Sequence, residues 1–153
     1  MSSVEREARD ALSRLHLSAG GPLGVDEALI QAVVHGFYGK VRSDALLKDI
    51  FNRVIGDNWD VHLAKMCDFW SSVLLMSGRF HGAPMVAHAR IPDIEPEHFV
   101  RWLQLFDETT QALCPGPKAE LFMAKAALIA RSLQYGIAAS RGEMPLRAAA
   151  AEA

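Results

Sequence analysis

Apolar residues recur every three or four positions along several stretches of the chain, the spacing that places them on one face of an α-helix. The first stretch begins after Asp26, a residue type that commonly caps helices, and ends near Arg42. Its predicted buried face consists of Ile30, Val33, Val34, Phe37, Tyr38 and Val41. A shorter helix is predicted after Ser43-Asp44, with apolar positions at Leu46, Leu47, Ile50 and Phe51.

The most regular pattern follows the turn at residues 55–58 and predicts a helix that ends near Ser77-Gly78. One face of this helix carries Trp59, His62, Met66, Phe69, Trp70 and Val73. Two later helices are predicted. One starts at Asp93-Ile94-Glu95-Pro96 and is broken by Pro115-Gly116-Pro117, and the other runs from Lys118 to about Tyr135 with Leu121, Ala124, Leu128 and Ser132 on one face. No segment alternates with a period of two, so the predicted fold class is all-α, with irregular helix packing.

One short segment stands apart from these helices. Between Pro84 and Pro92 there is room for only about two helical turns, and His88 lies toward the second proline. A short element with a proline at each end is rigid, which suits the binding of a ligand. A lone histidine beside apolar residues is nevertheless more often a packed or surface residue, so His88 needs support from the rest of the chain.

Length and composition indicate one globular domain with an addition at each end. The 153 residues fit a single core, and no apolar run approaches the roughly 20 residues needed to cross a bilayer. We predict an N-terminal extension at residues 1–24 that ends in a flexible joint at 18–24, a folded domain at 25–138, and a flexible tail at 139–153. The net charge of −2, without a basic run, argues against nucleic acid as a partner.

The first residues and the cysteines favour a cytoplasmic location. The chain begins with charged residues where a signal peptide would be apolar. Cys67 and Cys114 form neither a CxxC pair nor a covalent haem-attachment motif, and they suit a reducing compartment. We therefore expect a soluble protein that is a monomer or a weak dimer, with no membrane partner.

Histidines are the remaining candidates for chemistry, because the chain has no GxSxG, no phosphate-binding Gly-rich loop and no HExxH. Four of the six histidines are predicted to lie in the extension, off an apolar face, in a loop and at an exposed helix start: His16, His35, His81 and His98. His62 and His88 differ, since each lies among apolar residues on a separate helix. Two such imidazoles suit one metal ion or the two sides of a flat cofactor.

The residues around these two histidines favour haem over zinc. A tetrahedral zinc site needs further ligands at suitable spacing, and none is visible. A haem needs one axial histidine, an apolar lining and a few polar groups on the other face. An ordinary core is an equally good interpretation of the apolar residues that would line such a pocket: Phe37, Phe51, Met66, Phe69, Trp70, Trp102 and Phe106.

Four runs of residues, taken together in their order and spacing, resemble the truncated haemoglobins of group III. The resemblance covers residues 26–135, and no single motif carries it. The runs are Phe37-Tyr38-Gly39-Lys40-Val41-Arg42-Ser43-Asp44-Ala45-Leu46-Leu47-Lys48-Asp49-Ile50-Phe51, Trp59-x-x-His62-x-x-x-Met66-x-x-Phe69-Trp70, Gly82-x-Pro84-x-x-x-His88 and His98-Phe99-x-x-Trp102-Leu103-x-Leu105-Phe106.

The resemblance implies a truncated globin fold, a 2-on-2 helical sandwich around a pocket for non-covalent haem b. It implies that His88 is the proximal ligand of the iron. On the distal, gas-binding face it places Tyr38, His62 and Trp102. Met66 stands where the family usually has an aliphatic residue. The other residues expected to contact the haem are Phe51, Lys65, Phe69 and Trp70, with Lys65, Arg79 and Arg90 as candidate partners of the propionates or as surface charges.

The implied function is reversible binding of O2, NO or CO, for oxygen storage or delivery. Hydrogen bonds from Tyr38 and Trp102 would hold dioxygen, each contributing on the order of 1 kcal/mol. An alternative is detoxification, as an NO dioxygenase or a peroxidase-like enzyme that draws electrons from an external reductase. A third possibility is a helical sensor or interaction module that binds no cofactor.

Overall fold

The computed structural model describes residues 2–142 and is entirely helical over that range, which confirms the predicted all-α class. Helix boundaries lie within a few residues of the predicted ones for the long helices. The elements are α1 (Ser3–Leu17), α2 (Glu27–Val41), α3 (Lys48–Ile55), α4 (Trp59–Leu75), α5 (Pro84–Ala89), α6 (Pro96–Leu113) and α7 (Pro117–Ser140).

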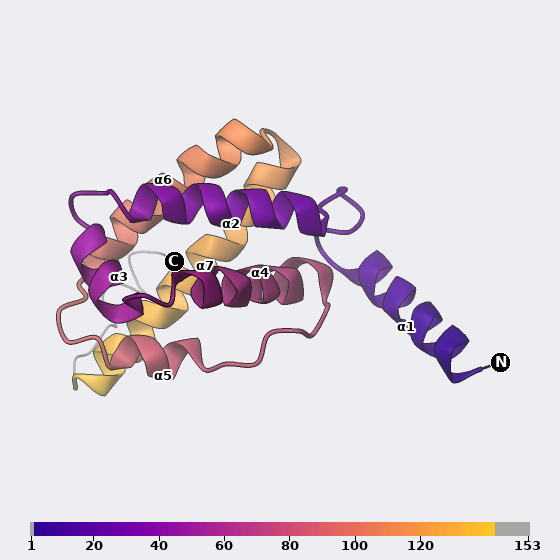
Figure 1. Ribbon diagram of the computed structural model, residues 1–153, viewed down its shortest axis with the longest axis horizontal. Helices are drawn as coiled ribbons and strands as arrows, with labels where there is room; N and C mark the ends of the chain where they lie inside the picture. Colours follow the sequence, from indigo (N-terminus) through magenta and orange to yellow (C-terminus); the bar gives the residue numbers. More distant parts are fainter. Residues whose placement is uncertain (1, 143–153) are drawn as a thin grey trace.

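Four long helices form two packed pairs. Helix α2 packs against both α4 and α6, and α6 packs against α7 (Figure 1). The pair α2/α4 thus lies on the pair α6/α7, which is the predicted 2-on-2 arrangement. The short α5 packs against α7, and α3 bridges α2 and α4 in the chain. Helix α1 projects away from this body (Figure 1).

The centre of the core is the ring of Phe106 in α6, which is 1% exposed. It stacks nearly parallel to Trp70 of α4 and to Trp102 of the same helix, with centroid distances of 5.1 and 5.7 Å. Phe37 of α2 meets it edge-on at 5.2 Å, and Phe122 of α7 is tilted against it at 6.1 Å. All four long helices therefore meet at one aromatic cluster.

Local sequence signals account for the helix ends. The Asp26 carboxylate accepts a hydrogen bond of 2.8 Å from the Leu29 amide and caps α2, as predicted. Helix α4 ends where Met76 adopts a left-handed conformation, with φ of 57°. Helices α5, α6 and α7 each begin with a proline, whose missing N–H is not needed in the first turn.

The predicted buried face of α7 is wrong. Leu128 is 48% exposed, and Ala124 and Ser132 are exposed as well. Apolar residues occur on several sides of this alanine-rich helix, so periodicity alone does not select one of them. Contact with α5 and α6 selects the face made by Ala119, Phe122, Ala126, Ala130, Leu133 and Ile137.

The connection between α1 and α2 is more ordered than the predicted flexible joint. The Gly20 amide donates a hydrogen bond of 2.9 Å to the Leu74 carbonyl oxygen of α4, and Ser18 and Val25 are buried. A side chain at residue 20 would place its Cβ 2.9 Å from that oxygen, so the glycine permits the close approach. The division into residues 1–24, 25–138 and 139–153 stays a prediction, and the tail from residue 143 onward lies outside the described residues.

Over residues 2–142, no helix combines the length and apolar character needed to cross a membrane.

The buried face of α7 can be tested with a pair of variants on that helix. Phe122 is fully buried, so Phe122→Ala should lower the free energy of unfolding by about 3–5 kcal/mol. Leu128→Ala, at the half-exposed position, should change it by no more than about 0.5 kcal/mol. Urea unfolding followed by circular dichroism measures both. A larger loss for Leu128→Ala than for Phe122→Ala would restore the face predicted from the sequence.

Candidate functional site

A cavity of about 540 Å³ lies between the helices and opens to the surface. Its size falls in the range of small-molecule and cofactor pockets. Residues from every helix except α1 contribute to its lining, which is predominantly apolar. Nine residues predicted from the sequence lie on its wall: Tyr38, Phe51, His62, Lys65, Met66, Phe69, Trp70, His88 and Trp102. Phe37 and Phe106, also expected to line the pocket, lie in the core beside it.

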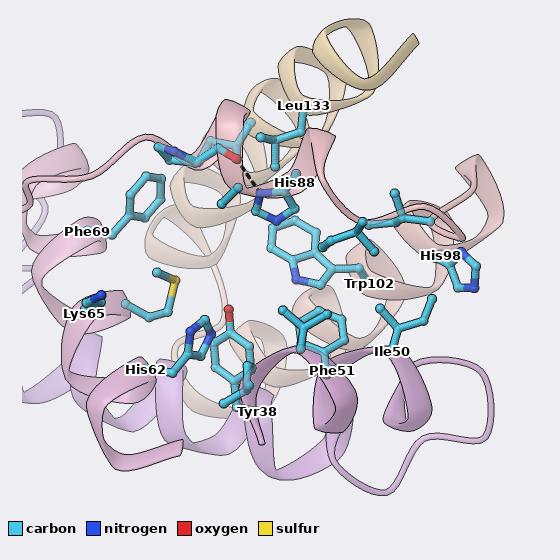
Figure 2. Close-up of a pocket in the computed structure, with 18 of the residues that line it drawn as sticks. Tyr38, Ile50, Phe51, His62, Lys65, Phe69, His88, His98, Trp102 and Leu133 are labelled. Carbon is cyan, nitrogen blue, oxygen red and sulfur yellow. Dashed lines mark hydrogen bonds between the residues drawn. The ribbon is translucent and has the colours of Figure 1, made fainter. Parts of the chain in front are cut away.

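His88 occupies one side of the cavity. Its Nδ1 lies 2.7 Å from the carbonyl oxygen of Pro84, one turn earlier in α5 (Figure 2). Because the carbonyl oxygen can only accept, Nδ1 carries the proton and donates it, and the other ring nitrogen, Nε2, has a free lone pair. Pro84 begins α5 and His88 lies in its last turn, so this contact fixes the plane of the imidazole relative to the helix.

Tyr38 lies on the opposite side, with its hydroxyl directed into the cavity (Figure 2). The ring is packed edge-on against Phe37, at 4.8 Å, and against His62, at 5.0 Å, which holds its orientation. Burial raises the pKa of Tyr38 far above its usual value, so the hydroxyl remains protonated and can donate. No residue between 2 and 142 forms a hydrogen bond with this hydroxyl.

His62 stands beside Tyr38, and its Nε2 is the only buried side-chain polar atom in the described part of the chain that lacks a hydrogen-bond partner. Burial is the largest cause of a lowered pKa of His62, about 4, and a positive charge on Lys65, or on His88 when that ring is protonated, lowers it further. The ring is therefore neutral at pH 7. An unpaired buried polar atom of this kind is costly.

Trp102 contributes a third polar group to the wall. Its indole is stacked on Phe106 with an angle of 7° between the rings and meets Phe37 edge-on at 5.5 Å. These contacts fix the ring, and its nitrogen faces the cavity (Figure 2). Tyr38, His62 and Trp102 thus surround a region that faces His88, and each has hydrogen-bonding capacity left over for a ligand.

The three cations proposed as propionate partners differ in placement. Lys65 lines the cavity at its exposed edge. Arg79 does not line it, because its guanidinium pairs with Glu27, at 2.9 Å, and Asp68, at 3.0 Å, so its candidacy is wrong. Arg90 is exposed and also lies outside the lining. Lys65 is therefore the remaining candidate.

Sequence reasoning missed part of the wall, namely Ile50, Ile91, Ile94, His98, Phe99, Ile129 and Leu133. His98 is the clearest case, because it was taken to be an exposed helix start. Its Nδ1 accepts a hydrogen bond of 2.8 Å from the Glu95 amide, and the Glu95 side chain caps the helix in return. The signature of a capping box is Ser/Thr-x-x-Glu/Gln, so Glu95-x-x-His98 gave no clear signal in the sequence.

An all-α chain with one imidazole facing a tyrosine hydroxyl and a second imidazole across an apolar cavity has the plan of a globin. No family model matches the chain. It is 33% identical over 113 residues to group 3 truncated hemoglobin ctb of Campylobacter jejuni, a match that covers 72% of this chain and 89% of that protein. It is also similar to the crystal structure of the group III truncated hemoglobin from Campylobacter jejuni, with a TM-score of 0.71, 32% identity, and coverage of 74% of this chain and 91% of the other.

The chain belongs to the group III truncated haemoglobins. Membership in this family implies a haem cofactor, and the residues present fit one. The wall is largely apolar, His88 offers a single free imidazole nitrogen, and the Tyr38 hydroxyl points into the cavity on the opposite side (Figure 2). Over residues 2–142, no three His, Cys, Asp or Glu side chains are grouped to hold a metal ion by themselves, so a metal here would need ligands of its own, as porphyrin supplies.

Burial of His62 makes the stability of the haem-free protein depend on pH. In the unfolded chain His62 takes up a proton near its ordinary value of 6.5, but in the folded chain only near 4. Between these values the unfolded state binds more protons, so the free energy of unfolding should fall as the pH is lowered through that window. Above it, the contribution of His62 is constant.

Urea unfolding of the haem-free protein at several pH values measures this dependence, with His62→Gln as the comparison. The wild-type protein should lose more stability than His62→Gln between about pH 6.5 and 4, because the variant lacks the titrating imidazole. Equal losses in the two proteins would show that His62 titrates alike in the folded and unfolded chains.

Proposed function

We propose that this protein is a b-type haem protein that binds diatomic gases reversibly, with His88 as the ligand of the iron. The observation that supports this most directly is the opposition of His88 to Tyr38, His62 and Trp102 across one cavity. The free Nε2 of His88 suits coordination, because its Nδ1–H is already held by the Pro84 carbonyl oxygen. The three polar groups on the other side lack protein partners at the cavity and are available to a small polar ligand.

The lining supports non-covalent binding of the haem. Cys67 and Cys114 are free, and neither lines the cavity, so no thiol is placed for a covalent attachment. The rings of Phe51, Phe69 and Trp70 and the thioether of Met66 would contact the apolar faces of the porphyrin. Lys65, at the exposed edge, would pair with a propionate.

When bound, the haem would supply an iron centre with one open position for a diatomic gas. The Tyr38 hydroxyl and the Trp102 indole N–H would donate hydrogen bonds at that position. A hydrogen bond to a group carrying charge contributes about 1.5–3 kcal/mol, and the low dielectric of the apolar wall strengthens it. Dioxygen accepts such bonds better than carbon monoxide, so these two residues would favour oxygen.

The proposed physiological role is oxygen storage or delivery in the cytoplasm, by a monomer or a weak dimer. Two free cysteines without a disulfide suit a reducing compartment.

The neutral imidazole of His62 favours a second candidate, detoxification as an NO dioxygenase or a peroxidase-like enzyme. This imidazole lies beside Tyr38 on the cavity wall and would serve as a general acid or base near the gas. The NO reaction combines one O2, one NO and one electron into nitrate, so an external reductase must supply the electron. The chain has no dinucleotide-binding motif of its own.

The assignment of His88 is tested by removing its imidazole. His88→Ala should lose most of the bound haem on purification with added haem, because the only free imidazole on that side is gone. The ratio of Soret to protein absorbance measures haem content. His35→Ala is the matched control, since His35 is exposed on α2 and outside the cavity lining, and this variant should keep the wild-type ratio. A wild-type Soret band in His88→Ala would contradict the assignment.

The two hydrogen-bond donors are tested separately by Tyr38→Phe and Trp102→Phe. Each should speed oxygen dissociation by about tenfold or more, the equivalent of one charge-assisted hydrogen bond. Carbon monoxide dissociation should change less, because CO is a poorer acceptor. Flash photolysis and ligand replacement measure these rates. Equal acceleration for both gases would indicate a steric effect in place of lost hydrogen bonds.

Rapid mixing distinguishes storage from detoxification. The oxygenated protein is mixed with NO, and the nitrate formed per haem is measured. The return of the ferrous form is then followed after a reductase and NADH are added. Many turnovers per haem would favour the NO dioxygenase, and a single turnover without recovery would favour storage or delivery.

A further inference from the structure

The helix that carries His88 has only six residues, and neither of its flanking connections is helical. So short an element is not stable by itself, and its place depends on what holds its ends. In the structure each end is held by an arginine from outside the helix. One is Arg79, in the connection before α5, and the other is Arg141, at the C-terminal end of α7.

The Arg79 anchor ties the connection before α5 to two other helices. The guanidinium donates to both carboxylate oxygens of Glu27 in α2, at 3.2 and 2.9 Å, and to Asp68 of α4, at 3.0 Å. The buried Ser71 hydroxyl lies 2.5 Å from Glu27 and 2.8 Å from the Ser77 hydroxyl. The bidentate contact between Arg79 and Glu27 fixes the orientation of the guanidinium as well as its distance from the carboxylate.

Immediately after Arg79, the chain continues toward α5 along a restricted path. The Phe80 amide donates to the Ser72 hydroxyl at 2.9 Å, and its ring meets Phe69, a residue of the cavity wall, edge-on at 5.1 Å. A Cβ at Gly82 would lie 2.6 Å from the tip of the Phe80 ring, so a larger residue there would displace the ring. Pro84 and the His88 helix begin two residues later.

The Arg141 anchor holds the other end. One nitrogen of its guanidinium, Nη2, lies within hydrogen-bond distance of three carbonyl oxygens, those of Ile91 at 3.2 Å, Pro92 at 3.1 Å and Ile94 at 2.9 Å. Its Nη1 is 3.5 Å from the Glu95 carboxylate. Arg53 of α3 adds an ion pair with Asp93 of the same segment. The turn after His88 is therefore tied to α7 and α3.

We propose that Arg79 and Arg141 are positioning residues for His88, which set the orientation of its imidazole toward the cavity. The inference rests on the proposed function, since it presumes that His88 binds the iron. Partly exposed ion pairs such as that of Arg79 add little to overall stability. Both anchors instead act on the only element that carries His88, so their main effect is on the freedom of the imidazole.

The test compares Arg79→Gln and Arg141→Gln with the wild-type haem protein, and Arg101→Gln is the matched control. Arg101 is a partly exposed arginine paired with Asp44 at 2.8 Å, and it touches neither end of α5. Resonance Raman of the ferrous, ligand-free form reports the stretch of the bond between iron and His88. Both anchor variants should show a broader band at lower frequency, because the imidazole samples more orientations. Arg101→Gln should match the wild type.

Glu27→Gln provides an independent check, because it breaks the Arg79 anchor from α2 and changes no residue of the α4–α5 connection. It should reproduce the band of Arg79→Gln. Hydrogen exchange of the amides at 85–91 in the haem-free variants should also be faster, while the exchange of α2 and α6 stays as in the wild type. This comparison separates a local effect on α5 from general unfolding.

An unchanged iron–histidine band in Arg79→Gln and Arg141→Gln would overturn the positioning role. So would an equal change in Arg101→Gln, which would indicate a general effect of losing surface ion pairs. If His88→Ala itself kept the wild-type band, the proposed iron ligand would be wrong, and that result is distinct from failure of the anchors.

Discussion

The stack of rings around Phe106 is the interaction on which the rest of the structure depends. Phe106 touches one ring from each of the other long helices and also Trp102 of its own. These aromatic side chains are large and stiff, and together they fill the centre of the core next to the cavity. The same stack places Trp102 on the cavity wall. One set of contacts therefore joins the two helix pairs and orients a residue of the candidate site.

The cavity differs from an ordinary protein core because some of its polar groups have no hydrogen-bond partner within residues 2–142. Buried polar groups normally find partners, yet the Nε2 of His62 has none among the described residues, and the Tyr38 hydroxyl is turned into open space. Tight aromatic packing on the far side of the cavity balances this cost. The Tyr38 hydroxyl points toward the side occupied by His88, as expected of a site completed by a bound cofactor.

The His88 side of the cavity and the distal side are held in place by different kinds of contact. Tyr38, His62 and Trp102 lie on long helices that the core holds directly. His88 lies on a six-residue helix whose ends are held by charged contacts reaching Glu27 and the carbonyl oxygens of 91–94. Packing thus fixes one face of the cavity, and hydrogen bonds and ion pairs fix the other. The second kind of contact is directional, which suits the placement of a single ring nitrogen.

Much of this could be predicted from the sequence because it depends on neighbours along the chain. The cap at Asp26 and the buried face of α2 from Ile30 to Val41 are local patterns, and the structure confirms both. The bracket of Pro84 and Pro92 indicated a short helix around His88. The ordered set of aromatic and histidine positions indicated the family, which the comparisons confirm.

Other features were decided only by the tertiary structure. Apolar residues surround α7 on several sides, and contact with α5 and α6 selects Phe122 over Leu128 for burial. Arg79 stood near the His88 segment in sequence, but it pairs with a carboxylate 52 residues away. Helical periodicity is a property of successive residues, whereas the choice of buried face and of ion-pair partner depends on surfaces brought together by folding. Local pattern was therefore enough to predict most of the helices and the candidate residues, but which of these residues contact one another depends on the folded arrangement of the helices.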